Sequence, residues 1–330
     1  MTNELQTDYP DIPRIDAHAH VGSDPGAISN YLRLRDIMQE TYGADMALWI
    51  NLGGGRERIA DPQAVTDAAE GRMASCISDY SAQTGLTYAP EELPQWIERG
   101  FIGYKIWSGP PHRRLKEGQD GYPYIDDPAH EATFAKMEAT GIVAASIHIA
   151  DPNGPYGDRH KWLPDPVAYW RNITAWRHVL ERHPKLEAVT AHMCWLCCQD
   201  AQLDYLRNML ATFPGLDIDL AATFQYYYLL NRENLRAFMI DYADRMLFGT
   251  DIGRWDAGDD ETTRQRVQRY FQSFQILETD GMVPGGFFGQ NSVQGLALPQ
   301  DVLEKIYFRN AVRRYPEVGT LMQKLGYEND

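Results

Sequence analysis

The chain has 330 residues, of which 44% are hydrophobic, so it can bury a large core in one big domain or two small ones. Its formal net charge of −15 argues against binding to nucleic acids or to anionic membrane surfaces, although a few local cations would still suit an anionic substrate. No stretch approaches the ~20 apolar residues of a membrane span, and the short polar N-terminus and four cysteines predict a cytoplasmic protein with free thiols.

Short apolar segments alternate with longer helical ones along most of the chain. Most of the short segments are apolar throughout, as expected for parallel strands that are covered on both faces. Each step from one segment to the next has room for one helix and two loops, which is typical of a (β/α)₈ barrel. The eight predicted strands are Arg14–His20, Met46–Asn51, Met73–Asp79, Ile102–Trp107, Ile142–His148, Glu187–His192, Leu216–Ala221 and Arg245–Asp251.

Helices are predicted between and after these strands. The clearest are Pro128–Thr140, which is followed by Gly141, and Val167–Arg182, Thr262–Glu278 and Gln300–Arg314. Two long connections, Ser108–Pro128 and Asp151–Pro166, are rich in Gly, Pro and Asp and are typical of active-site loops. A doubly wound open sheet is the rival fold, but no Gly-x-Gly-x-x-Gly follows the first strand.

The predicted fold class is therefore α/β, a single distorted (β/α)₈ TIM barrel. We expect one domain over residues 1–330, with the eight strands within 14–251 and C-terminal helices within 262–314. In such a barrel the active site lies at the C-terminal ends of the strands.

Polar side chains recur at these predicted strand ends. His18 and His20 are two residues apart on the first strand, so both point to the same side and can bind one metal ion together. Burying so many polar groups without a partner would cost several kcal/mol, so a partner such as a metal ion is expected. The other strand-end residues are Lys105, His148, His192 and Asp251.

In these motifs the sequence resembles the amidohydrolase superfamily, and in particular its amidohydrolase-related branch of metal-dependent hydrolases and decarboxylases. The resemblance covers nearly the whole chain. It includes Asp-Ala-His-Ala-His at 16–20, Thr-Ala-His at 190–192, Phe-Gly-Thr-Asp at 248–251 and Tyr-Phe-Arg-Asn-Ala at 307–311. It implies that His18, His20, His148 and Asp251 bind a divalent metal ion and that His192 lies beside this ion.

One divalent ion is therefore the expected cofactor. Imidazole ligands favour Zn²⁺, with Mn²⁺ and Fe²⁺ left open. Such an ion acidifies a bound water and polarises a carbonyl group. His192 and Asp251 are the candidate catalytic residues. His192 either moves a proton and steadies a developing negative charge, or binds a second metal ion.

Lys105, Trp107 and Arg254 are the candidate substrate-binding residues, because each lies at or just past a strand end. Two-metal relatives carry a bridging carbamylated lysine or a glutamate on the fourth strand. We favour an unmodified Lys105 that binds a substrate carboxylate or pairs with a neighbouring carboxylate, since an ammonium group near a metal ion needs an anion. Trp195 and Tyr226–Tyr228 are weaker candidates for the same pocket.

The remaining histidines and the cysteines carry no predicted role. Cys194, Cys197 and Cys198 include a Cys-x-x-Cys, but without a second pair they are interpreted as buried apolar thiols. The histidines with no partner spacing are His112, His130, His160, His178 and His183.

The sequence allows three functions for this protein. The first is a metal-dependent hydrolase that cleaves an amide, lactone or related bond of a small molecule, with or without a carboxylate group. The alternative, which the resemblance also allows, is a non-oxidative decarboxylase or hydratase of an unsaturated or aromatic acid. The third is an inactive barrel that serves as a binding protein, against which the complete ligand set argues. The expected partner is a small-molecule substrate, with no nucleic acid and no membrane, and a homo-oligomer is left open.

Overall fold

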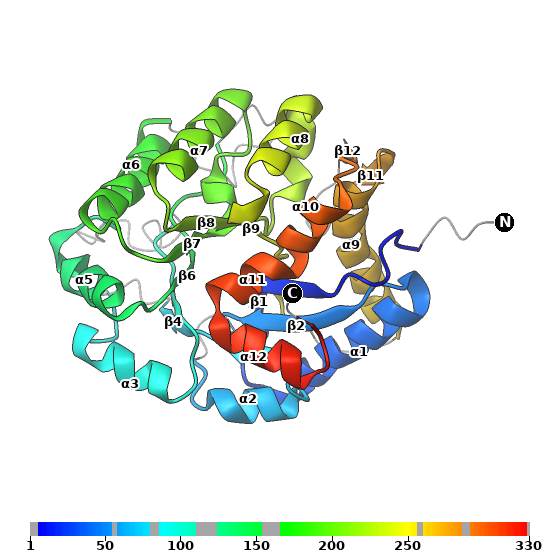
Figure 1. The fold of residues 1–330 in the computed structure, drawn as a ribbon, viewed down its shortest axis with the longest axis horizontal. Helices are drawn as coiled ribbons and strands as arrows, with labels where there is room; N and C mark the ends of the chain where they lie inside the picture. Colours follow the sequence, from blue (N-terminus) through cyan, green and yellow to red (C-terminus); the bar gives the residue numbers. More distant parts are fainter. Residues whose placement is uncertain are drawn as a thin grey trace. The chain divides into compact units, whose positions relative to one another are not determined.

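The computed structural model describes most of the chain, in two compact units. The first unit comprises Met1–Ser75 and Leu220–Asp330, and the second comprises Cys76–Asp219 (Figure 1). Large parts of the two predicted active-site loops, with His112 and His160, lie outside the described residues. Described are residues 6–54, 58–79, 86–109, 124–153, 166–255, 260–285 and 291–328.

A parallel sheet ordered β10-β1-β2-β3 forms the centre of the first unit. Its register pairs Ala19 with both Ile252 and Asn51, so the carboxyl ends of three strands lie at one level. Almost every side chain of β1 and β2 is buried, as predicted for parallel strands that are covered on both faces. The strands are β1 (Arg14–His20), β2 (Met46–Asn51), β3 (Met73–Ser75) and β10 (Ile252–Gly253).

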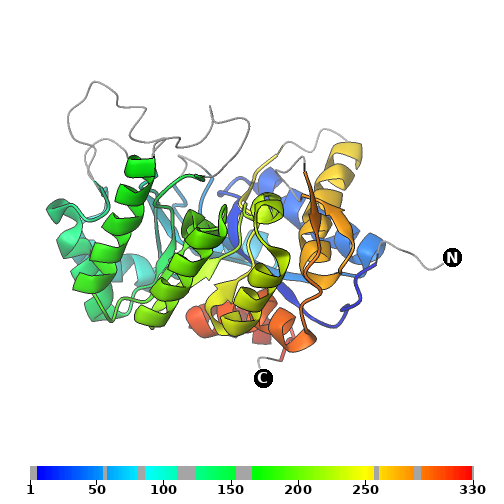
Figure 2. The ribbon, with the colours of Figure 1, turned by 90° about the horizontal axis from the view of Figure 1, so that it is seen from above.

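Helices pack on this sheet, and α1 lies beside α9 in both views of the ribbon (Figures 1 and 2). Tyr42 of α1 stacks on Phe271 of α9 with ring centroids 4.1 Å apart. Local sequence sets the ends of α1: Asp24 accepts a 2.8 Å hydrogen bond from the Ala27 amide, and Gly43 ends the helix at φ 65°. The helices are α1 (Pro25–Tyr42), α2 (Pro62–Ala68), α8 (Arg232–Asp241), α9 (Asp260–Glu278), α10 (Gln300–Glu304), α11 (Asn310–Arg314) and α12 (Pro316–Lys324).

Shorter elements complete the first unit. A π-helical turn at Lys305–Arg309 separates α10 from α11, so the predicted helix Gln300–Arg314 is present but not regular. An antiparallel hairpin joins β11 (Met282–Pro284) to β12 (Ser292–Gln294). The remaining elements are the 3₁₀ turns Phe224–Leu229 and Ala243–Arg245 and the short strand β9 (Met246–Leu247).

The second unit also contains a parallel sheet, in the order β4-β5-β6-β7-β8. Helices α6 and α7 lie side by side in both ribbon views (Figures 1 and 2). The predicted helices Pro128–Thr140 and Val167–Arg182 are confirmed, and Gly141 ends the first at φ 71°. The strands are β4 (Ile77–Asp79), β5 (Tyr104–Ile106), β6 (Ala144–Ile147), β7 (Ala188–Thr190) and β8 (Leu216–Asp219), and the α-helices are α3 (Leu93–Glu98), α5 (Glu131–Thr140), α6 (Pro166–Arg182) and α7 (Asp200–Thr212).

Six of the eight predicted strands differ from the observed ones. The predicted strands Ile102–Trp107, Ile142–His148 and Leu216–Ala221 are present but shorter, as β5, β6 and β8. The other three differ more. The predicted strand Met73–Asp79 is interrupted at Cys76 and forms β3 and β4. The predicted strand Glu187–His192 ends at Thr190, because His192 adopts a left-handed conformation that no β-ladder accommodates. The predicted strand Arg245–Asp251 is reduced to β9, since Asp251 is also left-handed, at φ 64°.

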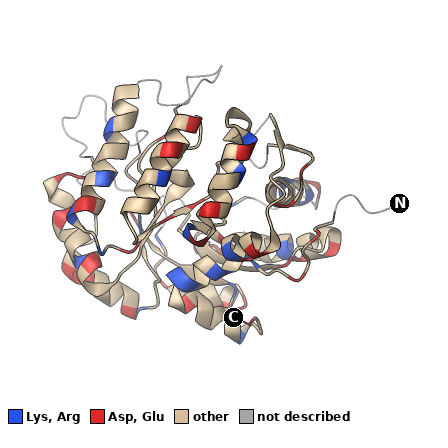
Figure 3. Cartoon of the chain, turned by 45° about the horizontal axis from the view of Figure 1, so that its top comes forward, with Lys and Arg blue, Asp and Glu red and all other residues tan. Residues whose placement is uncertain are grey.

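The described helices carry both signs of charge. In Figure 3, ribbon segments of lysine and arginine (blue) are interspersed with those of aspartate and glutamate (red) along the helices. Among the described residues, no helix combines the length and the apolar character that a membrane span needs.

Candidate metal centre

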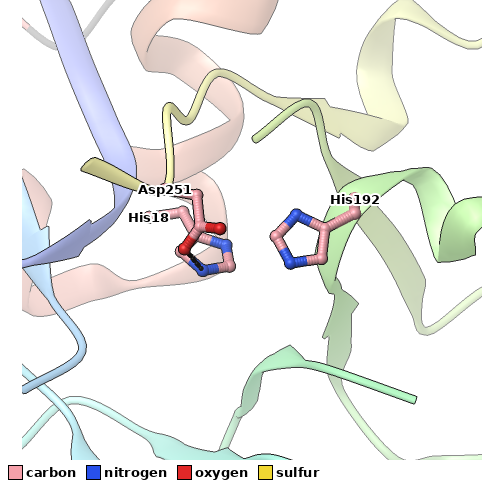
Figure 4. Close-up of side chains that lie close together, drawn as sticks. All are labelled: His18, His192 and Asp251. Atoms are coloured by element: carbon pink, nitrogen blue, oxygen red, sulfur yellow. Dashed lines mark ion pairs between the residues drawn. The ribbon is translucent and has the colours of Figure 1, made fainter. Parts of the chain in front are cut away.

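The first unit brings three predicted ligands together at the carboxyl end of β1. His18 and His20 point the same way, with ring centroids 5.2 Å apart. Oδ1 of Asp251 lies 3.3 Å from Nε2 of His18 and 3.1 Å from Nε2 of His20. Figure 4 shows the pair His18–Asp251 and marks it with a dashed line; His192, also labelled there, belongs to the second unit.

This geometry fits a divalent ion. Ligand atoms about 2.0–2.1 Å from a zinc ion at tetrahedral angles stand about 3.3–3.4 Å apart, close to the two separations from Asp251. A carbonyl oxygen only accepts, so the 3.1 Å contact of His20 Nδ1 with the Gly53 carbonyl puts the proton on Nδ1. In the neutral ring, Nε2 then carries a lone pair toward the carboxylate. Two electron-rich atoms at this distance require a proton or a cation between them.

Close backbone approach explains the glycine in Phe-Gly-Thr-Asp. A Cβ on Gly249 would lie 2.9 Å from the Cβ of His18 and 3.3 Å from that of Ala221, which is too close for any other residue without a shift. The amide of Asp251 donates a 2.8 Å hydrogen bond to the His18 carbonyl. The glycine therefore lets the segment that carries Asp251 lie directly against β1.

Asp16, which has no predicted role, ties the same two segments together. Its Oδ1 accepts hydrogen bonds from the amides of His18 (2.9 Å) and Thr250 (3.1 Å). Its Oδ2 accepts from the hydroxyls of Thr250 (2.6 Å) and Tyr270 (2.5 Å). Burial raises the pKa of Asp16 to about 6, even though these hydrogen bonds lower it. The signal in the sequence was its place inside Asp-Ala-His-Ala-His.

The second unit pairs the other two predicted histidines. Nε2 of His192 lies 3.1 Å from Nδ1 of His148, so one of these nitrogens carries a proton when they bond to each other. Nε2 of His148 lies 3.6 Å from Oδ1 of Asp151, a buried carboxylate that sequence reasoning missed. Asp151 follows His148 by three residues, and this spacing after a strand end was the available signal.

His192 begins a left-handed turn of four residues that contains no glycine. The φ values are 59° for His192, 51° for Met193, 59° for Cys194 and 53° for Trp195. Left-handed backbone costs about 1–2 kcal/mol per residue, so contacts from elsewhere must hold the turn.

Three contacts hold this turn. Asp219 accepts a 2.9 Å hydrogen bond from the His192 amide, and the Tyr169 hydroxyl donates a 2.8 Å hydrogen bond to the Trp195 carbonyl. The indole of Trp195 stacks on the His192 imidazole, with centroids 4.5 Å apart and an interplanar angle of 28°. Strain at the position of a candidate catalytic group is a common feature of functional sites.

The predicted substrate-binding residues have different surroundings. Lys105 is buried, and its Nζ donates to the Ser146 carbonyl on the neighbouring strand. Trp107 meets His148 edge to face at 5.4 Å. Arg254 is exposed in the first unit, where its amide donates a 3.1 Å hydrogen bond to the His20 carbonyl. A Cβ on Gly109 would lie 2.8 Å from Cδ2 of His148, so this glycine also allows a close approach.

The described residues without a predicted role have structural partners. Nδ1 of His130 contacts the Ile125 carbonyl, His178 pairs with Asp126, and His183 pairs with two glutamates. All four cysteines are free, as predicted, and all four are buried, which was predicted for Cys194, Cys197 and Cys198. Burial raises the pKa of the Cys194 and Cys197 thiols well above their usual value, so these thiols are neutral at physiological pH.

Comparison with known proteins supplies the family context. The sequence profile of the amidohydrolase family matches residues 15–316. No curated protein matches the sequence significantly. Among solved structures, an uncharacterised TIM-barrel protein from Bordetella bronchiseptica is similar over 93% of this chain and 99% of its own, at 16% identity and a TM-score of 0.57. A dihydroorotase from Campylobacter jejuni is similar over 91% and 82%, at 11% identity and a TM-score of 0.50. These likenesses confirm the predicted TIM-barrel fold.

Proposed function

Because the chain belongs to the amidohydrolase family, we propose that it is a metal-dependent hydrolase that cleaves an amide, lactone or related bond of a small molecule, with or without a carboxylate group. The observation that supports this most directly is the approach of His18 and His20 to a single carboxylate oxygen of Asp251. We further propose that the chain is one domain and acts in the cytoplasm on a small-molecule substrate.

The proposed metal ligands are His18, His20, His148 and Asp251, and the proposed ion is zinc. Three of these ligands meet within the first unit. His148 follows β6, and in a TIM barrel the carboxyl ends of all strands share one face, which supports its inclusion. Neutral imidazole and carboxylate ligands also bind Mn²⁺ and Fe²⁺, which are the alternatives to zinc.

His192 and Asp251 are the proposed catalytic residues. When bound, a divalent ion supplies a Lewis acid that polarises a carbonyl group and acidifies water. His192 holds or moves a proton at Nε2, the atom that faces His148. The left-handed turn and the stacked Trp195 fix the direction of this imidazole. Asp251 takes part in the same proton transfer through its carboxylate.

Lys105, Trp107 and Arg254 are the proposed substrate-binding residues. An ammonium group has three N–H donors, so the bond from Lys105 to Ser146 does not exhaust its capacity to bind a carboxylate. Trp107 offers an aromatic surface beside His148. Arg254, whose backbone amide donates to the His20 carbonyl, carries a guanidinium group that can bind a carboxylate.

A panel of carboxylated lactones, cyclic amides and unsaturated acids tests this function. Each compound is incubated with purified, chelated and zinc-restored protein, while ring opening and carbon dioxide release are followed separately. Hydrolysis that disappears on chelation and returns with zinc supports the proposal. Carbon dioxide release in step with substrate loss would identify a decarboxylase instead. Tight binding without turnover would identify a binding protein.

A further inference from the structure

Asn51 lies at the end of β2 and is fully buried. Its Oδ1 accepts hydrogen bonds from three backbone amides, those of Val21 (3.2 Å), Gly22 (3.1 Å) and Gly53 (3.0 Å). Its Nδ2 donates a 2.8 Å hydrogen bond to the Gly22 carbonyl. The oxygen and the nitrogen of the Asn51 amide can therefore be told apart. If the group were flipped, its NH₂ donors would face the three backbone N–H donors and could not bond to them. One side chain thus holds the chain just after β1 and just after β2.

The contact with Gly53 extends this network to His20. The Gly53 amide is bound to Asn51, and the Gly53 carbonyl accepts from Nδ1 of His20 at 3.1 Å. Gly53 adopts φ 86°, a turn conformation that most other residues would not adopt without strain. Asn51 therefore determines where the carbonyl that meets the His20 ring is placed.

We propose that Asn51 is a positioning residue that selects the Nδ1–H tautomer of His20 through the carbonyl of Gly53. In that tautomer the lone pair lies on Nε2, the atom 3.1 Å from Asp251 Oδ1. Val21 and Gly22 are held by the same amide, so the strand end that carries His20 is fixed as well. The inference rests on the proposed function only where it concerns zinc binding, since the bond from Nδ1–H to the Gly53 carbonyl forms with the ion bound and also without it, when a proton lies between Nε2 and Asp251.

The first measurement needs no variant. Nitrogen-15 NMR of the metal-free protein distinguishes protonated from unprotonated ring nitrogens. The His20 signals are assigned by their loss in His20→Asn. We expect Nδ1 of His20 to be protonated, and a His20 whose Nδ1 is unprotonated would overturn the proposal.

The second measurement compares two alanine variants. Asn51→Ala removes the amide that holds Gly53. Asn310→Ala is the matched control, because Asn310 is also buried in the first unit and donates to the carbonyls of Ala243 and Met246, both at 2.7 Å. We expect a mixture of His20 tautomers in Asn51→Ala alone. Asn51→Asp, which keeps an acceptor for the Gly53 amide, should restore the Nδ1–H form.

Zinc affinity separates this inference from the proposed function. Competition with a chromophoric chelator, with Zn²⁺ alone as the ligand, should show roughly 10–100-fold weaker binding in Asn51→Ala, the usual effect of losing a group that orients a metal ligand. Equal tautomer changes in Asn51→Ala and Asn310→Ala would show general loosening and overturn the positioning role. A changed tautomer in a protein that binds none of Zn²⁺, Mn²⁺ and Fe²⁺ would leave Asn51 as proposed and refute the metal-dependent function.

Discussion

The phenol of Tyr270 donates a 2.5 Å hydrogen bond to Oδ2 of Asp16, so helix α9 is connected to the strand that carries His18. Oδ1 of the same carboxylate accepts from the amides of His18 and Thr250. Asp16 and Tyr270 are both buried. This pair therefore couples the position of His18, a candidate ligand, to the packing of α9, although Asp16 and Tyr270 are 254 residues apart in the sequence.

Tyr270→Phe should destabilise the protein, because it leaves the buried Asp16 carboxylate with one hydrogen bond fewer. We expect the free energy of unfolding to fall by about 1–3 kcal/mol, the usual cost of removing one partner of a buried polar group. Urea unfolding of the metal-free protein measures this. Tyr228→Phe is the control, since Tyr228 is exposed, and equal losses in both variants would contradict a specific role for Tyr270.

Purified protein should contain close to one divalent ion per chain, with zinc as the expected metal. His18→Ala and Asp251→Asn should each lose the ion, because each removes a proposed ligand from the cluster at the end of β1. Elemental analysis after dialysis measures the metal content. His130→Ala should keep the ion, as Nδ1 of His130 contacts only a backbone carbonyl in the described structure. Full activity after exhaustive chelation would refute the prediction.

His192→Asn should keep the metal content and lose roughly 10²–10⁴-fold in turnover, the usual contribution of an acid–base group. The reason is that its Nε2 pairs with His148 while its backbone is held by Asp219. Steady-state kinetics and elemental analysis are run on the same preparation. His178→Asn, at an exposed position on α6, should change neither quantity. Loss of metal from His192→Asn would make His192 a ligand and indicate a two-metal centre.

Lys105→Met should raise KM for carboxylated substrates far more than it changes metal content. The ammonium group is buried and already donates to Ser146, so its loss removes a positive charge in a site shielded from water. Lys185→Met, at an exposed position, is the charge-matched control. Density for a carbamate on Lys105 that bridges two ions about 3.5–4 Å apart would instead support a two-metal mechanism.

Asp126 should contribute stability at neutral pH that disappears in acid. Burial raises its pKa, but hydrogen bonds from Arg171 and His178 outweigh burial and lower the pKa below its usual value. A lowered pKa in the folded state means that the stability is present above the unfolded pKa and is lost as pH falls through the folded pKa.

The corresponding variant is Asp126→Asn. Compared with the unsubstituted protein, this variant should have a clearly lower free energy of unfolding at pH 6 and a smaller difference at pH 3. Urea unfolding at both pH values measures this. Asp204→Asn, whose carboxylate is largely exposed, should show little difference between the two pH values. A loss for Asp126→Asn that is the same at both pH values would contradict the prediction.

Much of the fold followed from the sequence alone. The strands Arg14–His20 and Met46–Asn51 have the predicted ends. Met46–Asn51 is apolar up to its last residue, and Arg14–His20 was identified from the spacing of its histidines at a strand end. The period of two along β1 places His18 and His20 together, as predicted. Gly141 ends its helix as expected, since glycine adopts φ 71° without strain. These features depend on residues close together in the chain, so a local pattern is enough to specify them.

Only the tertiary structure decided the details of the candidate site. Nothing local predicts left-handed backbone at Asp251 or over His192–Trp195, because no glycine stands there. That backbone is held by distant groups: the Asp16 carboxylate bonds to the Thr250 amide, and the Asp219 carboxylate bonds to the His192 amide. The roles of Asn51 and Tyr270 are equally invisible in the sequence. Residue types and spacing determined which side chains are candidates, whereas contacts between distant segments determined how each is held, because strained backbone and buried polar groups persist only where folding supplies their partners.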